Sequence, residues 1–306
     1  LLGSIKEFKW EEGRHFFAAQ SILKSGHFFS YTVQGQHYIN HPPFFIWVVV
    51  GFAKILGELN EITLRLPAAL SVLATGLFIY FHLRHRLSFE SAFFAAGCFI
   101  TFPCVIVFSS VGEQATLMSL VILLLVISWC QIYENQHIRI KNVTLFTALL
   151  MIGNLTYWPT FPMILCAALF LSALLEKKFE IIKILAASST ISIIPFAMWC
   201  IHNYHRQDGI IFIHEMTRLD MPITWTQYIL QRKEILSGVL IGFPWLLIAF
   251  YFMLTMIYKG KAGKYFYNGL FTYVLLFMAV VFLAPHARSR FLIACSSIIA
   301  LIMGHA

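Results

Sequence analysis

The sequence has few charged residues for its length. Asp, Glu, Lys and Arg together make up 12% of the 306 residues, whereas hydrophobic residues make up 59%. A soluble domain carries charge on about a quarter of its residues, so this composition excludes an ordinary soluble protein. A helix needs about 20 apolar residues to cross a bilayer, and apolar runs of that order recur along the chain. The composition therefore predicts an all-α polytopic membrane protein in contact with membrane lipids.

Cysteine is scarce, and its spacing excludes a disulfide framework or a cysteine-based metal site. No two cysteines show the paired spacing that such sites require. All lie inside or at the end of apolar runs, where buried or lipid-facing thiols are expected. The six cysteines are Cys98, Cys104, Cys130, Cys166, Cys200 and Cys295.

Acidic residues are outnumbered by basic ones, 14 to 22, which gives a formal net charge of +8. This excess does not indicate a nucleic-acid-binding protein, because the Lys and Arg residues are spread over short loops between apolar runs. The sequence also lacks an initiator Met, a signal peptide, an internal repeat and a low-complexity tract. We expect an excerpt of a longer protein, without a first spanning helix and a C-terminal part.

The basic loops predict the orientation of the chain, because cytoplasmic loops of membrane proteins are enriched in Lys and Arg. When those loops are placed in the cytoplasm, the helices alternate consistently and give nine spans. Residues 1–66 then form a first non-cytoplasmic loop with juxtamembrane helices, and 202–234 form a second. Transmembrane helices fill 67–201 and 235–306. The loops placed in the cytoplasm contain Arg84 and Arg86, Arg139 and Lys141, Lys177, Lys178 and Lys183, and Lys259, Lys261 and Lys264.

Two helices are expected in the first outer loop. A short amphipathic helix over Phe16–Lys24 ends at Gly26, and an apolar helix over Phe44–Leu56 is too short to span, so we expect it to lie at the membrane interface. Further along, prolines break the apolar stretch 143–175 into two helices at Tyr157–Pro162. The other helices expected before the second loop are Pro67–Leu83, Ser91–Phe108, Ala115–Tyr133 and Ile184–Ile201.

Acids from two separate loops fall on the non-cytoplasmic side. Glu11 and Glu12 open a helix, and Glu113 lies at the mouth of another. Acids at helix starts are favoured by the helix dipole, so ordinary solvated helix ends are one interpretation. Two acids on one face also suit a general base and a partner that orients it or the incoming nucleophile.

Histidines in the same region leave a metal site as an alternative. His37 and His41 are four residues apart, and His15 lies near the acid pair. Imidazole and carboxylate groups are common ligands of zinc and other transition metals. However, Gly35 and Pro42 make the intervening stretch a poor helix, so the spacing does not ensure that the rings share one face.

Arginines lie on the non-cytoplasmic side, where the charge bias disfavours them. A guanidinium binds phosphate through two parallel hydrogen bonds, so such a group suits a phosphorylated substrate. For any single arginine, anchoring to lipid headgroups is the simpler interpretation. Four together favour a phosphate-bearing substrate: Arg65, Arg218, Arg288 and Arg290.

Several stretches match a known family in the same order along the chain. The first outer loop carries Glu11-Glu12-Gly13-Arg14-His15, Gly26-His27-Phe28, His41-Pro42-Pro43-Phe44-Phe45-Ile46-Trp47 and Leu64-Arg65-Leu66-Pro67-Ala68-Ala69-Leu70. Later come Phe212-x-x-Glu215-x-x-Arg218, Pro222-x-x-Trp225-x-x-Tyr228, Pro244-Trp245 and Arg288-x-Arg290-Phe291-Leu292. Together these stretches resemble the membrane glycosyltransferases related to dolichyl-phosphate-mannose protein mannosyltransferases, a group that includes the bacterial lipid A aminoarabinose transferase.

The resemblance implies a GT-C fold, a bundle of spanning helices with interfacial helices in the first outer loop. It implies transfer of a sugar from a polyprenyl-phosphate donor with inversion, without a required cofactor. The family's base matches Glu11, its next acid matches Glu12, and a later acid matches Glu113. His15 and His41 stand where the family usually has Tyr and Lys, so His41 becomes a candidate phosphate contact.

The resemblance also suggests a location and leaves part of the function open. We expect an integral protein of the bacterial inner membrane whose site faces the periplasm or the exterior. The acceptor is open: lipid A, another glycolipid, a glycan of the cell envelope or a protein. A transporter or lipid flippase is the main alternative, although such proteins often contain inverted repeats and none is found here. A non-catalytic scaffold of the same fold is a third interpretation.

Overall fold

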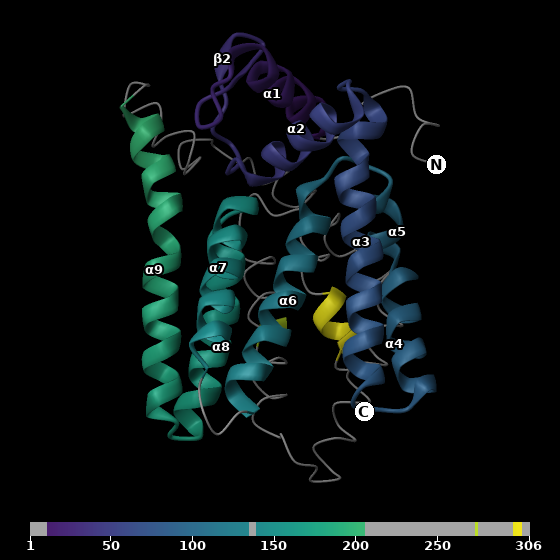
Figure 1. The fold of residues 1–306 in the computed structure, drawn as a ribbon, viewed down its shortest axis with the longest axis vertical. Coiled ribbons are helices and arrows are strands. Elements are labelled where there is room, and N and C mark those ends of the chain that lie inside the picture. The colour runs from purple at the N-terminus through teal and green to yellow at the C-terminus, as the bar shows by residue number, and fades with distance from the viewer. Residues whose placement is uncertain (1–10, 135–138, 206–272, 275–295, 302–306) are drawn as a thin grey trace, which may run out of the picture.

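The computed structural model describes residues 11–134, 139–205, 273–274 and 296–301. Within these ranges the chain is almost entirely helical, which confirms the all-α prediction. Long helices stand side by side as a bundle, and α1, α2 and a small hairpin lie across one end of it (Figure 1). We call the segment 11–59, which contains those three elements, the cap.

The cap begins with α1, Glu12–Ser25, which starts before the predicted Phe16 and ends, as predicted, just before Gly26. Gly26 follows with φ of 74°, a left-handed conformation that glycine adopts without steric penalty. Two short strands, β1 (Thr32–Val33) and β2 (Gln36–His37), then pair antiparallel. The turn between them has positive φ at both Gln34 and Gly35, as tight hairpins require. This hairpin was not predicted, because its strands are only two residues long.

The second cap helix, α2, covers Phe44–Leu56, the predicted bounds. Pro43 precedes it, and Gly57 ends it with φ of 86°. Its apolar side packs in one core cluster with α1 and the start of α3. Its placement at a membrane interface stays a prediction.

The third helix, α3, runs from Glu61 to Arg84 and starts earlier than predicted. The side chain of Asn60 accepts a hydrogen bond from the backbone N–H of Thr63, and the Thr63 hydroxyl accepts one from the backbone N–H of Asn60. This capping box begins the helix before Pro67, which lies inside it. Arg65 therefore belongs to a long helix rather than to a loop.

The stretch Ser91–Phe108 was predicted as one helix, which is wrong, although it can still form one span. The structure has two helices, α4 (Phe89–Ile100) and α5 (Pro103–Ser109), bent by 59°. Pro103 is the cause, because proline disfavours the helical conformation of the residue before it, and Phe102 is extended with ψ of 125°. The next helix, α6 (Gln114–Glu134), is more buried than the other two long apolar helices, α3 and α9.

The predicted break in 143–175 is confirmed. Helices α7 (Ile140–Thr156) and α8 (Thr160–Leu175) meet at a turn that contains Pro159, and α9 covers Phe179–Tyr204. Helices α3, α6 and α9 are long and apolar enough to cross a membrane, and the bent pair α4–α5 makes a fourth candidate span. Three of the nine predicted spans fall in residues 235–306, most of which lie outside the described ranges, as does the loop 202–234 beyond its start.

Candidate functional site at the cap

Contacts between distant parts of the sequence fix the cap to one end of the bundle. The Nδ1 atom of His15 lies 2.9 Å from the backbone oxygen of Gly112, in the turn before α6. The ring of His41 lies 5.6 Å from the ring of Tyr157, in the turn before α8. Three of the loops that were predicted to share one face therefore meet at one end of the bundle.

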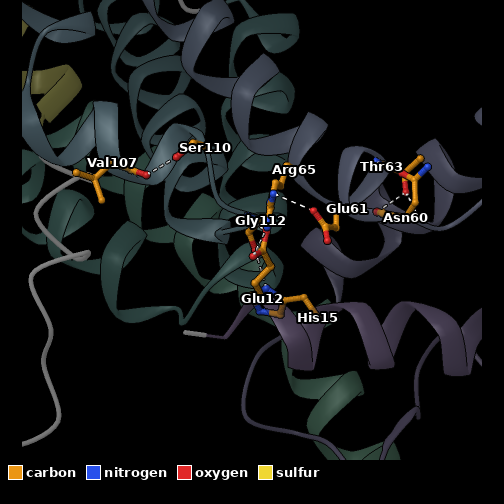
Figure 2. A network of polar contacts seen from close by, with 9 residues as sticks. All are labelled: Glu12, His15, Asn60, Glu61, Thr63, Arg65, Val107, Ser110 and Gly112. Atoms are coloured by element: carbon orange, nitrogen blue, oxygen red, sulfur yellow. Dashed lines mark hydrogen bonds and ion pairs between the residues drawn. The ribbon is translucent and has the colours of Figure 1, made fainter. Parts of the chain in front are cut away.

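Glu12 is the centre of this attachment (Figure 2). Its carboxylate is fully buried, and both of its oxygens accept hydrogen bonds. Arg65 donates from Nε to Oε1 at 2.6 Å and from Nη2 to Oε2 at 3.0 Å, and the backbone N–H of Gly112 donates to Oε1 at 3.0 Å. A buried carboxylate is tolerated only when it is paired in this way, so the three groups depend on one another.

Arg65 completes the network from the α3 side. Its side chain is 0% exposed, and its Nη1 lies 3.3 Å from Oε2 of Glu61, one turn earlier in the same helix. The guanidinium is thus surrounded by protein carboxylates. Arg65 was predicted to contact a phosphate or to anchor to lipid headgroups. Its pairing with Glu12 was not predicted, because the two residues are 53 positions apart and share no motif.

The backbone N–H and the carbonyl of Gly112 both form hydrogen bonds with α1. Its N–H donates to Glu12, and its carbonyl accepts from His15, which requires the proton of His15 to be on Nδ1. A Cβ atom at position 112 would lie 2.8 Å from Cγ of Leu64 and 3.1 Å from the backbone oxygen of Leu64. Only glycine allows this close approach of the turn to α3.

The other two predicted acids are sequence neighbours of the bonded pair. Glu11 directly precedes Glu12, is 7% exposed and accepts a 2.9 Å hydrogen bond from Nη1 of Arg14. Glu113 directly follows Gly112, is fully buried and immediately precedes the first residue of α6. A negative charge at that position is favoured by the helix dipole. The structure therefore anchors Glu11 and Glu113 to the same junction.

His41 lies in an aromatic environment beside this junction. Its ring lies 5.8 Å from the ring of His15 and 6.2 Å from the ring of Tyr38. The hydroxyl of Tyr31 donates to its backbone oxygen at 3.1 Å. Burial raises the pKa of Tyr31 and keeps this hydroxyl in its neutral, donating form.

The three histidines considered for a metal site do not form one cluster. His15 and His41 are buried near each other, whereas His37 is exposed on β2 of the hairpin. Across the part of the chain that the structure describes, no group of three or more His, Cys, Asp and Glu side chains is placed to hold a metal ion. The predicted arginines Arg218, Arg288 and Arg290 lie outside the described residues.

Comparison with known proteins agrees with the resemblance noted in the sequence. A sequence model of the dolichyl-phosphate-mannose-protein mannosyltransferase family matches residues 40–202, more than half of the chain. A search of curated proteins finds no match.

Two solved structures of ArnT from Cupriavidus metallidurans have a similar fold. The apo structure matches with a TM-score of 0.75 at 15% identity, over 97% of this chain and 55% of ArnT. The structure bound to undecaprenyl phosphate matches with a TM-score of 0.76 at 16% identity, over the same shares of the two chains. The chain thus spans about half the length of the ArnT structures. The protein has the GT-C fold that the resemblance implied, and it belongs to the dolichyl-phosphate-mannose-protein mannosyltransferase family.

Proposed function

We propose that the protein is a membrane glycosyltransferase that moves a sugar from a polyprenyl-phosphate donor to an acceptor on the non-cytoplasmic face. Family membership supports the reaction type. The similarity to an ArnT structure that holds undecaprenyl phosphate supports a lipid-phosphate donor. The charge pattern of the loops supports the orientation, with the protein in the bacterial inner membrane and the site toward the periplasm or exterior. The acceptor is a lipid, glycan or protein.

The observation that carries this proposal is the anchoring of the first turn of α1. Glu12 is tied to two other elements, so the neighbouring Glu11 has a fixed position at the end of the bundle. Glu11 has a surface-facing partner, Arg14, whose side chain is 49% exposed. A carboxylate that is largely desolvated but close to the surface suits a general base.

In the proposed reaction, Glu11 accepts the proton of the acceptor hydroxyl or amine, and Glu113 orients the acceptor. The acceptor oxygen or nitrogen bonds to the anomeric carbon from the face opposite the phosphate. The bond between that carbon and the phosphate oxygen breaks, the lipid phosphate leaves with the electron pair, and the anomeric configuration inverts. The proton ends on Glu11, and no cofactor is required.

Cations near the leaving phosphate would offset its developing charge. We assign this task to Arg218, Arg288 and Arg290, together with His41 at the edge of the cap. His41 would act there as a hydrogen-bond donor through its ring N–H. The role of Arg65 is treated separately below.

The test is transfer by the full-length protein in vesicles. Undecaprenyl-phosphate-linked pentose and hexose donors, radiolabelled in the sugar, are supplied together with a membrane extract as acceptor, with and without EDTA. We expect labelled product from the wild-type protein in both arms. Glu11→Gln should lower transfer by about 10²–10⁴-fold, the usual contribution of a general base.

The matched control is Glu58→Gln, which removes an exposed acid of the same cap and should transfer at the wild-type rate. Full transfer by Glu11→Gln would show that another group is the base. Movement of the intact donor across the bilayer without sugar release would instead indicate a flippase. Loss of transfer in EDTA would show that a divalent metal takes part.

A further inference from the structure

We propose that Arg65 and Glu12 act as a positioning pair that fixes Glu11 and Glu113, and that Arg65 makes no contact with the donor phosphate. This inference rests on the proposed function for its activity readout. It assigns Arg65 a different task from the other arginines of the predicted site. Glu12, likewise, becomes a positioning residue rather than a catalytic one.

The guanidinium of Arg65 is already bound by carboxylates of the protein. Nε and Nη2 of Arg65 donate to the two oxygens of Glu12, and Nη1 faces Glu61. Each of the three guanidinium nitrogens therefore has a carboxylate partner. A lipid phosphate would have to displace at least one of these carboxylates to contact Arg65.

The Glu12–Arg65 pair lies where three parts of the fold meet. Glu12 belongs to α1, Arg65 to α3, and Gly112, which also binds the Glu12 carboxylate, to the turn before α6. Figure 2 shows Glu12, Arg65 and Gly112 in contact at this junction. Since Glu11 precedes Glu12 and Glu113 follows Gly112, one buried ion pair sets the positions of both proposed acids.

Removing only one partner of this buried ion pair should cost more than removing both. A buried charge left without its counterion drives a rearrangement or solvation of the site, whereas removing both charges leaves no such penalty. A displacement of about 1 Å at a reacting group can lower the rate by about 10²-fold. A positioning pair should therefore show strong, non-additive effects on turnover.

The experiment compares Glu12→Gln, Arg65→Met and the double variant in the full-length protein. For each we would measure kcat and KM for transfer, and the Kd for undecaprenyl phosphate itself. We expect each single variant to lower kcat on the order of 10²-fold with an unchanged Kd. The double variant should lose no more than either single variant. Arg84→Met, which removes an exposed arginine at the opposite end of α3, is the control and should behave as wild type.

A direct phosphate contact predicts a different pattern. Arg65→Met would then weaken undecaprenyl phosphate binding equally with and without Glu12→Gln, and Glu12→Gln alone would bind normally. That result would overturn the inference. If a single variant fails to fold, Arg65→Lys and Glu12→Asp serve instead. Lys keeps the charge but loses the two parallel donors, and Asp keeps the charge on a side chain shorter by one methylene. They should lower kcat with an unchanged Kd.

Amide hydrogen exchange tests the pair independently of sugar transfer. The amides of the first turn of α1 should exchange faster in each single variant than in the wild type or in Arg84→Met. Unchanged exchange there would contradict the positioning role even if activity fell. A wild-type protein that transfers no sugar but shows this exchange pattern would overturn the proposed function and keep the structural role of the pair.

Discussion

The side-chain amide of Asn203 donates a 3.1 Å hydrogen bond to the backbone oxygen of Phe29, 174 positions earlier in the sequence. The same amide donates to the backbone oxygen of Trp199 at 2.8 Å, which holds the side chain in place. Trp199 also packs against Ile39 in a small buried cluster. The end of α9 thus attaches to one side of the cap, while the Glu12 junction attaches the other side.

The Asn203 contact predicts a local effect on the cap. Asn203→Leu removes both donors, at a net loss of about 1 kcal/mol for each hydrogen bond. We expect faster amide hydrogen exchange in residues 26–41 and a small fall in the thermal midpoint in detergent. His205→Ala, at an exposed position just beyond the end of α9, should change neither. Unchanged exchange in residues 26–41 of Asn203→Leu would show that the cap does not depend on α9.

Gly112→Ala should separate the turn before α6 from α3. The added methyl would lie 2.8 Å from Cγ of Leu64 and 3.1 Å from the backbone oxygen of Leu64, both inside normal contact distances. We expect a destabilisation of about 1–3 kcal/mol, as for other overpacked sites, seen as a lower midpoint of thermal unfolding. Gly51→Ala, where the new methyl meets nothing within 4 Å, is the matched control in α2. Equal midpoints for the two variants would contradict this account of Gly112.

The elements that the sequence predicted well are those with local signals. Pro43 and Gly57 bound an apolar run, so the ends of α2 could be placed in advance. Pro159, with its aromatic neighbours, marked the turn between α7 and α8 in the same way. The bend at Pro103 carried a similar signal, but the apolar run continues across it and hydropathy alone obscured it.

The candidate site was predictable only in part. Composition and resemblance identified Glu11, Glu12 and Glu113 as acids of one face. The ion pair between Glu12 and Arg65 has no periodic signal, because it joins side chains of two helices that become neighbours only in the folded chain. The hydrogen bonds of His15 and Glu12 to Gly112 could not be predicted either, because every residue type has the same backbone groups.

Tyr31 offers a prediction with a defined pH dependence. Burial raises its pKa above the usual value near 10, so the folded protein keeps the hydroxyl neutral where the unfolded chain would ionise. Below pH of about 10, Tyr31→Phe should be less stable than wild type by about 1 kcal/mol, because the bond to the His41 carbonyl is lost.

Above pH of about 10 this difference should shrink, because ionisation of Tyr31 then stabilises the unfolded wild-type chain. Thermal midpoints of both proteins, measured from pH 7 to about 11, a range that crosses the reference tyrosine pKa, test the sign. Tyr204→Phe, at an exposed position, should show no such convergence. A stability difference for Tyr31→Phe that grows with pH would contradict the direction of the pKa shift.

Polar contacts between α7 and α9 should stabilise the bundle within its apolar part. The amide of Asn154 donates to the backbone oxygen of Ser192 at 3.0 Å, and the hydroxyl of Thr147 donates to Ser188 at 3.0 Å. Hydrogen bonds between membrane helices contribute about 0.6 kcal/mol on average and up to about 2 kcal/mol. Asn154→Leu should therefore lower the unfolding midpoint measurably in detergent. Thr190→Val, which removes only an exposed hydroxyl within α9, should not. Equal midpoints would mean that the hydrogen bond of Asn154 does not contribute measurably to the packing of α7 against α9.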